Sequence, residues 1–235
     1  VASQNGHEDV VKELLTDEEI DVNQGRTSDE VTPLYIACQF GHTAVVKLLV
    51  DAEADINQAK KDNGTTPLHI ACFNGHKAVV KLLLDAEAKI NQARTDDGTT
   101  PLHIACYNGH KAVVKLLLKK GANVNKPMDN GITPLYIASQ EDHKDVVELL
   151  LEAGAALSES DKEILSLKKT KDVKKIKKKI EKAKKQKEEK TVGPNCTISS
   201  PSEAEGSTGE PRPPDQGQVA GHPSGHRKVR KPAGG

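Results

Sequence analysis

The segment GTTPLHIACYNGHKAVVKLLL, residues 98–118, repeats residues 64–84 with one exchange, Tyr107 in place of Phe73. Residues 5–15, NGHEDVVKELL, match the second half of the same unit. A repeat of this kind is typical of a solenoid, in which each unit stacks on its neighbours. The opening Thr-Pro-Leu recurs at intervals of 34, 34 and 33 residues, beginning at Thr32, Thr66, Thr100 and Thr133.

The residues of one unit predict a short first helix with defined ends. Thr66 is a favourable N-cap, and Pro67 stands at the first helical position, where its missing N–H costs nothing. The helix should run to about Phe73 and stop at Gly75, because glycine readily adopts a left-handed backbone. This first helix is expected in every full unit.

A second helix should open near His76 and end around Glu87, and turns should separate the units. Asn63-Gly64, Asp97-Gly98 and Asn130-Gly131 are signals of tight, hairpin-like turns. Both helices are shorter than the roughly 12–15 residues that an isolated helix needs. The sequence therefore predicts an all-α solenoid of helix-turn-helix units with hairpin-like loops.

These motifs resemble the ankyrin repeat. The Thr-Pro-Leu-His-x-Ala pattern stands at residues 66–71 and 100–105, followed each time by Gly-His and Val-Val-x-Leu-Leu. The resemblance covers residues 1–157, as four full repeats preceded by a half repeat. Because the chain starts at Val1 within a motif, we expect it to be a fragment whose true N-terminus lies further upstream.

Four acidic residues stand where the repeat pattern has glycine. Glu53 and Glu87 occupy the helix-ending position held by Gly121 and Gly154 in the later repeats. A left-handed backbone costs a non-glycine residue roughly 1–2 kcal/mol, so we expect strain there. Glu30 replaces a turn glycine, and we expect that hairpin to be the least regular. Asp142 replaces the glycine between the two helices of its repeat.

The net charge of zero conceals an uneven distribution. Residues 1–157 hold 15 Lys or Arg and 23 Asp or Glu, whereas residues 158–190 hold 14 and 7. An acidic body with a basic appendage bears on the choice of partners rather than on the fold. No run of apolar residues is long enough to suggest a transmembrane segment, and no signal peptide is visible.

Residues 158–190 are predicted to form a basic helical cap, or degraded repeat, that covers the end of the array. Its lysines have three interpretations: a solvated outer face, a nuclear-import, nucleic-acid or anionic-membrane patch, or part of a short coiled coil. Residues 191–235, rich in Gly, Pro and Ser, are predicted to be a disordered tail.

The periodic cysteines and histidines predict packing rather than chemistry. Cys38, Cys72 and Cys106 each precede a histidine by four residues, but a glycine interrupts the helix between them. Equivalent residues in stacked units lie roughly 8–10 Å apart, too far for a disulfide or a shared zinc ion. We expect buried free thiols, as in a reducing compartment, and no metal site.

The histidines of the first helices are predicted to be structural. Tyr35 and Tyr136 replace His69 and His103 in the other two full repeats, an exchange that suits a ring bonded to backbone but not a general base. The histidines that begin the second helices are expected to form local hydrogen bonds near the helix start. No phosphate-binding loop and no nucleophile beside a base is present, so neither an enzyme nor a cofactor is predicted.

The resemblance to ankyrin repeats implies a concave binding face made of hairpin tips and the exposed side of the first helices. Phe73 and Tyr107 are its candidate anchors, since aromatic residues often dominate binding energy; the alternative is that each is an inert residue at a position that tolerates exchange. The same face would also include Thr65, Thr95, Thr99, Met128, Asn130, Ile132 and Glu141. The candidate partner-binding residues are Lys60, Lys61, Asp62, Asn63, Phe73, Asn74, Arg94, Asp96, Asp97, Tyr107, Asn108, Asp129 and Gln140.

We therefore expect a non-enzymatic scaffold or adaptor that binds another protein through this face, without a small-molecule substrate. The alternative is a nuclear or nucleic-acid-associated factor that uses the Lys-rich residues 168–190. The expected location is cytoplasmic or nuclear.

Overall fold

The computed structural model describes residues 1–157, and the predicted cap (158–190) and tail (191–235) lie outside the described residues. The described chain is helical, without β-strands, as the repeat pattern predicted. Its helices are α1 (Ala2–Asn5), α2 (Glu8–Leu14), α3 (Pro33–Phe40), α4 (Thr43–Asp51), α5 (Pro67–Phe73), α6 (Lys77–Asp85), α7 (Pro101–Tyr107), α8 (Lys111–Lys119), α9 (Pro134–Gln140) and α10 (Lys144–Glu152).

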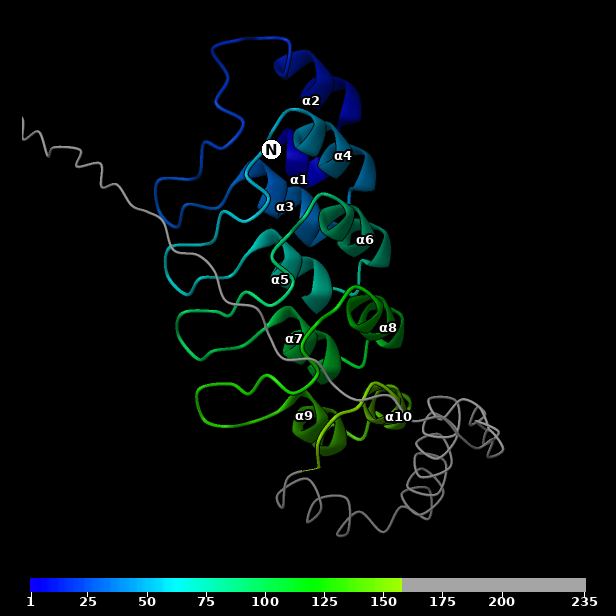
Figure 1. The fold of residues 1–235 in the computed structure, drawn as a ribbon. Coiled ribbons are helices and arrows are strands. Elements are labelled where there is room, and N and C mark those ends of the chain that lie inside the picture. Colours follow the sequence, from blue (N-terminus) through cyan, green and yellow to red (C-terminus); the bar gives the residue numbers. More distant parts are fainter. Residues whose placement is uncertain (158–235) are drawn as a thin grey trace, which may run out of the picture. The chain divides into compact units, whose positions relative to one another are not determined.

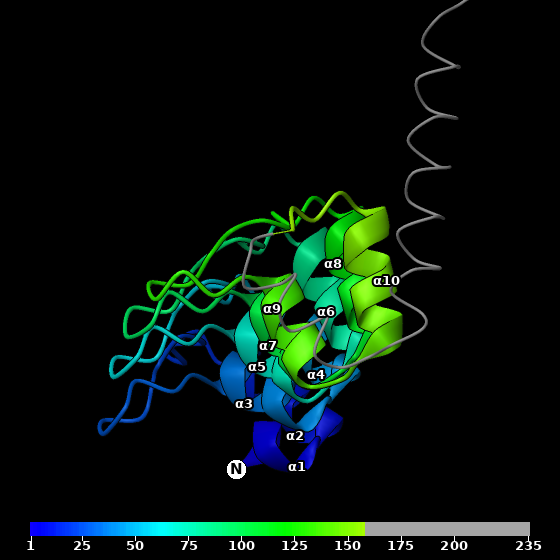
Figure 2. The same cartoon turned by 90° about the horizontal axis from the view of Figure 1, so that it is seen from below.

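The helices stack in two rows (Figure 1). The odd-numbered helices α1 to α9 form an inner row, from which the loops project to one side, and the even-numbered helices α2 to α10 form an outer row (Figures 1 and 2). Each helix packs against its partner in the repeat and against the equivalent helices of the adjoining repeats. We call α1 and α2 the half repeat, and the pairs from α3–α4 to α9–α10 the first to fourth full repeats.

The predicted capping sets the start of the inner helices α3, α5, α7 and α9. The Thr66 hydroxyl accepts a hydrogen bond from the backbone N–H of His69, and Pro67 occupies the first turn. The imidazole of His69 in turn accepts from the Thr66 N–H, which completes a capping box. The helix ends at Phe73, as expected.

Small and aliphatic side chains fill the space between the rows. Leu68, Val80 and Leu83 of the second full repeat are at most 1% exposed. Alanine and cysteine on the inner helices, such as Ala71 and Cys72, are fully buried and let the helices approach closely. This core runs through all the described repeats, because no repeat buries its apolar residues alone.

The four acidic residues in glycine positions all have a left-handed backbone. Their φ angles are 58° at Glu30, 60° at Glu53, 64° at Glu87 and 61° at Asp142. The prediction of an irregular hairpin at Glu30 is wrong, however. That hairpin closes with the same backbone hydrogen bond as the next two, whereas the fourth hairpin is one residue shorter and closes from Met128 N–H to Ile132 O.

Candidate interaction surface

Four hairpins extend from the inner helices and are joined tip to tip. The first three close through a bond from Arg26, Lys60 or Arg94 N–H to the carbonyl five residues later, at 2.8–3.0 Å. Successive tips are linked by three backbone hydrogen bonds: Lys61 N–H to Asp29 O, Thr95 N–H to Asn63 O and Asp129 N–H to Asp97 O, at 3.0–3.3 Å. The hairpins therefore form a continuous ribbon beside the inner helices.

The charges on this ribbon are largely paired within it. Arg26 bonds Asp29, and Lys60 bonds Asp62 at 3.1 Å. Arg94 bonds Asp96, while Lys61 reaches across to Glu30 at 3.2 Å. The side chains of Lys60 and Arg94 are only 20% and 25% exposed, so these two cations are less accessible than the sequence suggested.

Phe73 and Tyr107 end their inner helices as exposed side chains on a fixed backbone. They are 50% and 55% exposed. The Phe73 carbonyl accepts a hydrogen bond from His110 Nε2 of the next repeat, and the Tyr107 carbonyl accepts one from His143 Nε2, each at 2.9 Å. Two half-exposed rings thus occupy equivalent places on neighbouring repeats.

The prediction of local hydrogen bonds for the histidines of the second helices is wrong. None of the N-cap residues His42, His76, His110 and His143 caps its own helix with its side chain. Each ring reaches back to a carbonyl of the preceding repeat, because the repeats stack closely enough for the imidazole to span them. These carbonyls belong to Gln4, Gln39, Phe73 and Tyr107.

The histidines of the inner helices bond to backbone, as predicted. His69 Nδ1 lies 2.7 Å from the Thr66 hydroxyl, and its Nε2 lies 3.2 Å from the Thr99 carbonyl of the next repeat. His103 makes the same pair of contacts with Thr100 and Ile132. Burial lowers the pKa of both imidazoles to about 4, which keeps them neutral at physiological pH.

The candidate binding residues fall into two groups. The carboxyl and amide oxygens of Asp97 and Asn63 accept the N–H of the residue two positions on, so both close their own turns. The Asn74 and Asn108 amides bond the carbonyls of Ile70 and Ile104 within their own repeats. The other candidates, apart from the partly covered Lys60 and Arg94, are exposed: Lys61, Asp62, Phe73, Asp96, Tyr107, Asp129 and Gln140.

A second set of inter-repeat bonds was missed from the sequence. The side-chain oxygen of Asn57 accepts the Lys89 N–H at 2.8 Å, and that of Asn91 accepts the Asn123 N–H at 2.8 Å. The sequence does contain a sign of these bonds, because asparagine recurs at intervals of 34 residues. The full set of acceptors is Asn23, Asn57, Asn91 and Asn125.

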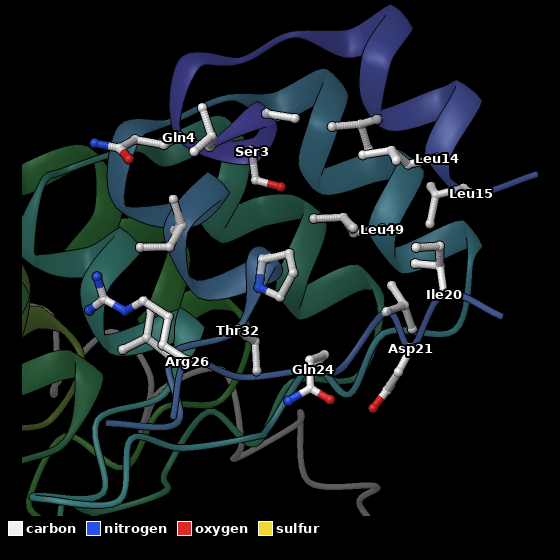
Figure 3. Close-up of a pocket in the computed structure, with 17 residues that line it drawn as sticks. Ser3, Gln4, Leu14, Leu15, Ile20, Asp21, Gln24, Arg26, Thr32 and Leu49 are labelled. Atoms are coloured by element: carbon white, nitrogen blue, oxygen red, sulfur yellow. The ribbon is translucent and has the colours of Figure 1, made fainter. Parts of the chain in front are cut away.

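A hollow of about 280 Å³ opens beside the half repeat, lined mainly by apolar residues of α1 to α4 and the loop after α2 (Figure 3). Leu14 lines it and is 46% exposed, whereas Leu49, at the equivalent position of the next repeat, is 3% exposed. None of the candidate binding residues lines this hollow.

The three described cysteines are free and buried, as expected. Burial raises the pKa of the Cys38, Cys72 and Cys106 thiols, so they stay protonated and unreactive. Ser139 takes the cysteine position of the fourth full repeat with a hydroxyl that has no hydrogen-bond partner in the described chain. Size rather than sulfur chemistry therefore selects this residue.

Residues 1–157 contain no cluster of three or more His, Cys, Asp or Glu arranged to hold a metal ion. Among the same residues, no helix combines the length and apolar character needed to cross a membrane.

Paired antiparallel helices, stacked in two rows with a ribbon of hairpins, define a helical repeat protein of the kind used as an interaction module. The model of a family described as ankyrin repeats (3 copies) matches residues 1–94 and 89–161. The chain belongs to the ankyrin repeat family. A search of curated proteins found no match. Ankyrin repeats generally bind other proteins and are typically non-enzymatic.

Proposed function

We propose that this protein is a non-enzymatic scaffold that binds a partner protein across the hairpin ribbon and the exposed ends of the inner helices, here called the ribbon face. The observation that carries the proposal is the pair of half-exposed rings at Phe73 and Tyr107. Their carbonyls are bonded to the next repeat, so little backbone entropy is lost when a partner covers them.

The chemistry of the ribbon face indicates what holds the partner. Its cations are bonded to acids of the same ribbon, so an incoming charge must compete with existing ion pairs. The two rings have no such competitor, and buried aromatic anchors contribute about 2 kcal/mol or more at interfaces. We therefore assign the main contribution to aromatic contacts, with polar contacts around them.

The test is a displayed peptide library selected against the full chain and counter-screened with a Phe73→Ala/Tyr107→Ala variant. Selected peptides should lose at least about tenfold in affinity to the variant. Val10→Ala/Ile20→Ala is the matched control, because it removes two exposed apolar side chains outside the ribbon face. Peptides that bind the aromatic variant as tightly as the parent would remove the basis of the proposal.

The proposed location is cytoplasmic or nuclear. Three buried cysteines without disulfides support a reducing compartment. Imaging of the tagged full-length protein in cells tests it, and secretion of the protein would refute it.

A further inference from the structure

The outer helices change charge along the stack. Counting Lys against Asp and Glu within each helix, α2 and α10 each carry −2, α4 carries 0, α6 carries +1 and α8 carries +3. Residues 1–157 as a whole are acidic. The positive charge of α6 and α8 is therefore a local reversal that the summed charge conceals.

The lysines of α6 and α8 form one exposed group. Within each helix they recur four residues apart, so they lie on the same side of it, and Lys120 follows directly after α8. Side-chain exposure reaches 65% at Lys81 and 57% at Lys111. We call this group the lysine face; it consists of Lys77, Lys81, Lys111, Lys115, Lys119 and Lys120.

Nearby acids neutralise only part of the lysine face. Asp85 bonds Lys81 and Lys120, each at 2.7 Å, and Lys111 bonds Asp145 at 2.9 Å. The hydrogen bonds from the two lysines lower the pKa of Asp85 to about 2. Among the ion pairs of residues 1–157, none involves the other three lysines of this face, namely Lys77, Lys115 and Lys119.

Helix stability explains only some of these lysines. Lys119 and Lys120 stand at the carboxyl end of α8, where a cation interacts favourably with the helix dipole. Lys77 and Lys111 instead occupy the first turn, where the dipole opposes a cation. By contrast, the first turn of α2 carries Glu8 and Asp9, and that of α10 carries Asp145 beside Lys144.

We propose that the lysine face is a second docking site, separate from the ribbon face, and that it binds an acidic helical segment of a partner protein. Neighbouring outer helices should lie about 8–10 Å apart, and seven residues of a helix rise about 10.5 Å. A helix lying across α6 and α8 therefore places carboxylates at i and i+7 over the two rows of lysines. Acids at i+3 and i+10 add a second pair on the same side.

The composition of the face favours such a partner over other polyanions. The two helices present no aromatic side chain between their lysines, as a surface that stacks nucleic-acid bases would. The exposed positions beside the lysines include Ala78 and Ala112, which offer little apolar surface for insertion into a bilayer.

The experiment measures binding of the full chain to fluorescein-labelled alanine-based helical peptides at low ionic strength. One peptide carries glutamates at i, i+3, i+7 and i+10, and a second carries the same glutamates dispersed around the helix. A Lys115→Gln/Lys119→Gln variant removes two lysines that are not in ion pairs while keeping their length. Lys12→Gln/Lys89→Gln removes two exposed lysines elsewhere. The lysines of residues 158–190 are the same in all three proteins.

The patterned peptide should bind more tightly than the dispersed one, and the lysine-face variant should weaken it about 2- to 25-fold, since each exposed ion pair contributes a factor of about 1.4–5. The control variant should leave the Kd of the patterned peptide unchanged.

Equal binding of the two peptides, or equal losses in both variants, would overturn the proposal. Tighter binding of single-stranded DNA or of phosphatidylserine vesicles, if the lysine-face variant loses it, would overturn the proposal in favour of that ligand. A Phe73→Ala/Tyr107→Ala variant should bind the patterned peptide normally, which separates this test from that of the ribbon face.

Discussion

Replacing Glu53 and Glu87 by glycine should stabilise the array, because both residues hold left-handed backbones at φ 60° and 64°. Gly121 ends α8 at the equivalent position. The backbone bonds around Glu87, at 3.3 and 2.9 Å, match those around Gly121, at 3.2 and 3.0 Å. The substitution therefore removes strain without changing the hydrogen bonding.

The strain is about 1–2 kcal/mol per residue, and the greater freedom of glycine in the unfolded chain cancels about 0.4–1 kcal/mol. The net gain is about 0.5–1 kcal/mol per site. For a chain of this size 1 kcal/mol raises Tm by about 2–4 °C, so the double variant should melt about 2–8 °C higher.

Thermal unfolding followed by circular dichroism, with urea titrations for the free energy of unfolding, measures the gain. Glu53→Ala/Glu87→Ala is the control, since it removes the charges but keeps a side chain at each left-handed position. Gly121→Ala should lower the free energy of unfolding by as much as Glu53→Gly or Glu87→Gly alone raises it, because an added Cβ at Gly121 contacts nothing within 4 Å. An alanine double variant as stable as the glycine one would refute backbone strain as the cause.

Two further predictions concern the histidines. Gly75→Ala should destabilise the chain by about 1–3 kcal/mol more than Gly121→Ala, because its Cβ would lie 2.8 Å from the ring of His110 and displace the contact of that ring with the preceding repeat; equal costs in urea titrations would contradict this. Burial lowers the pKa of His69 and His103 to about 4 in the folded chain, against about 6.5 when unfolded. The unfolded chain therefore binds more protons between these values, and the free energy of unfolding should fall by about 1 kcal/mol per histidine from pH 7.5 to 5.5. His69→Tyr/His103→Tyr, which copies the other repeats, should flatten this dependence, and an unchanged slope would show that other groups cause it.

Most of the fold could be predicted from the sequence, because the repeat period gives the order and the approximate ends of the helices. Thr66, Pro67 and Gly75 punctuate the first helix because each has a local backbone preference, and local preferences can be read without coordinates. The left-handed Glu53 and Glu87 were found by comparison with glycines one or two repeats away.

Contacts between repeats were harder to infer. The pattern within one unit does not say that His110 reaches back to Phe73 rather than capping α8. The periodic asparagines could have been noticed, since Asn57 and Asn91 obey the same interval as the rest of the motif. The lysine face could not be recognised from the net charge of residues 1–157. It requires knowing that α6 and α8 lie side by side in the outer row of helices.

The histidine and asparagine bonds between repeats end on main-chain atoms of the neighbour: His110 on a carbonyl, and Asn91 on an N–H. Apart from a glycine beside the histidine ring, such as Gly75 beside His110, these bonds require no particular side chain on the neighbouring repeat. A newly duplicated unit therefore fits beside its parent at once, without compensating substitutions. The near-identity of residues 64–84 and 98–118 is what growth by copying leaves in a chain built this way.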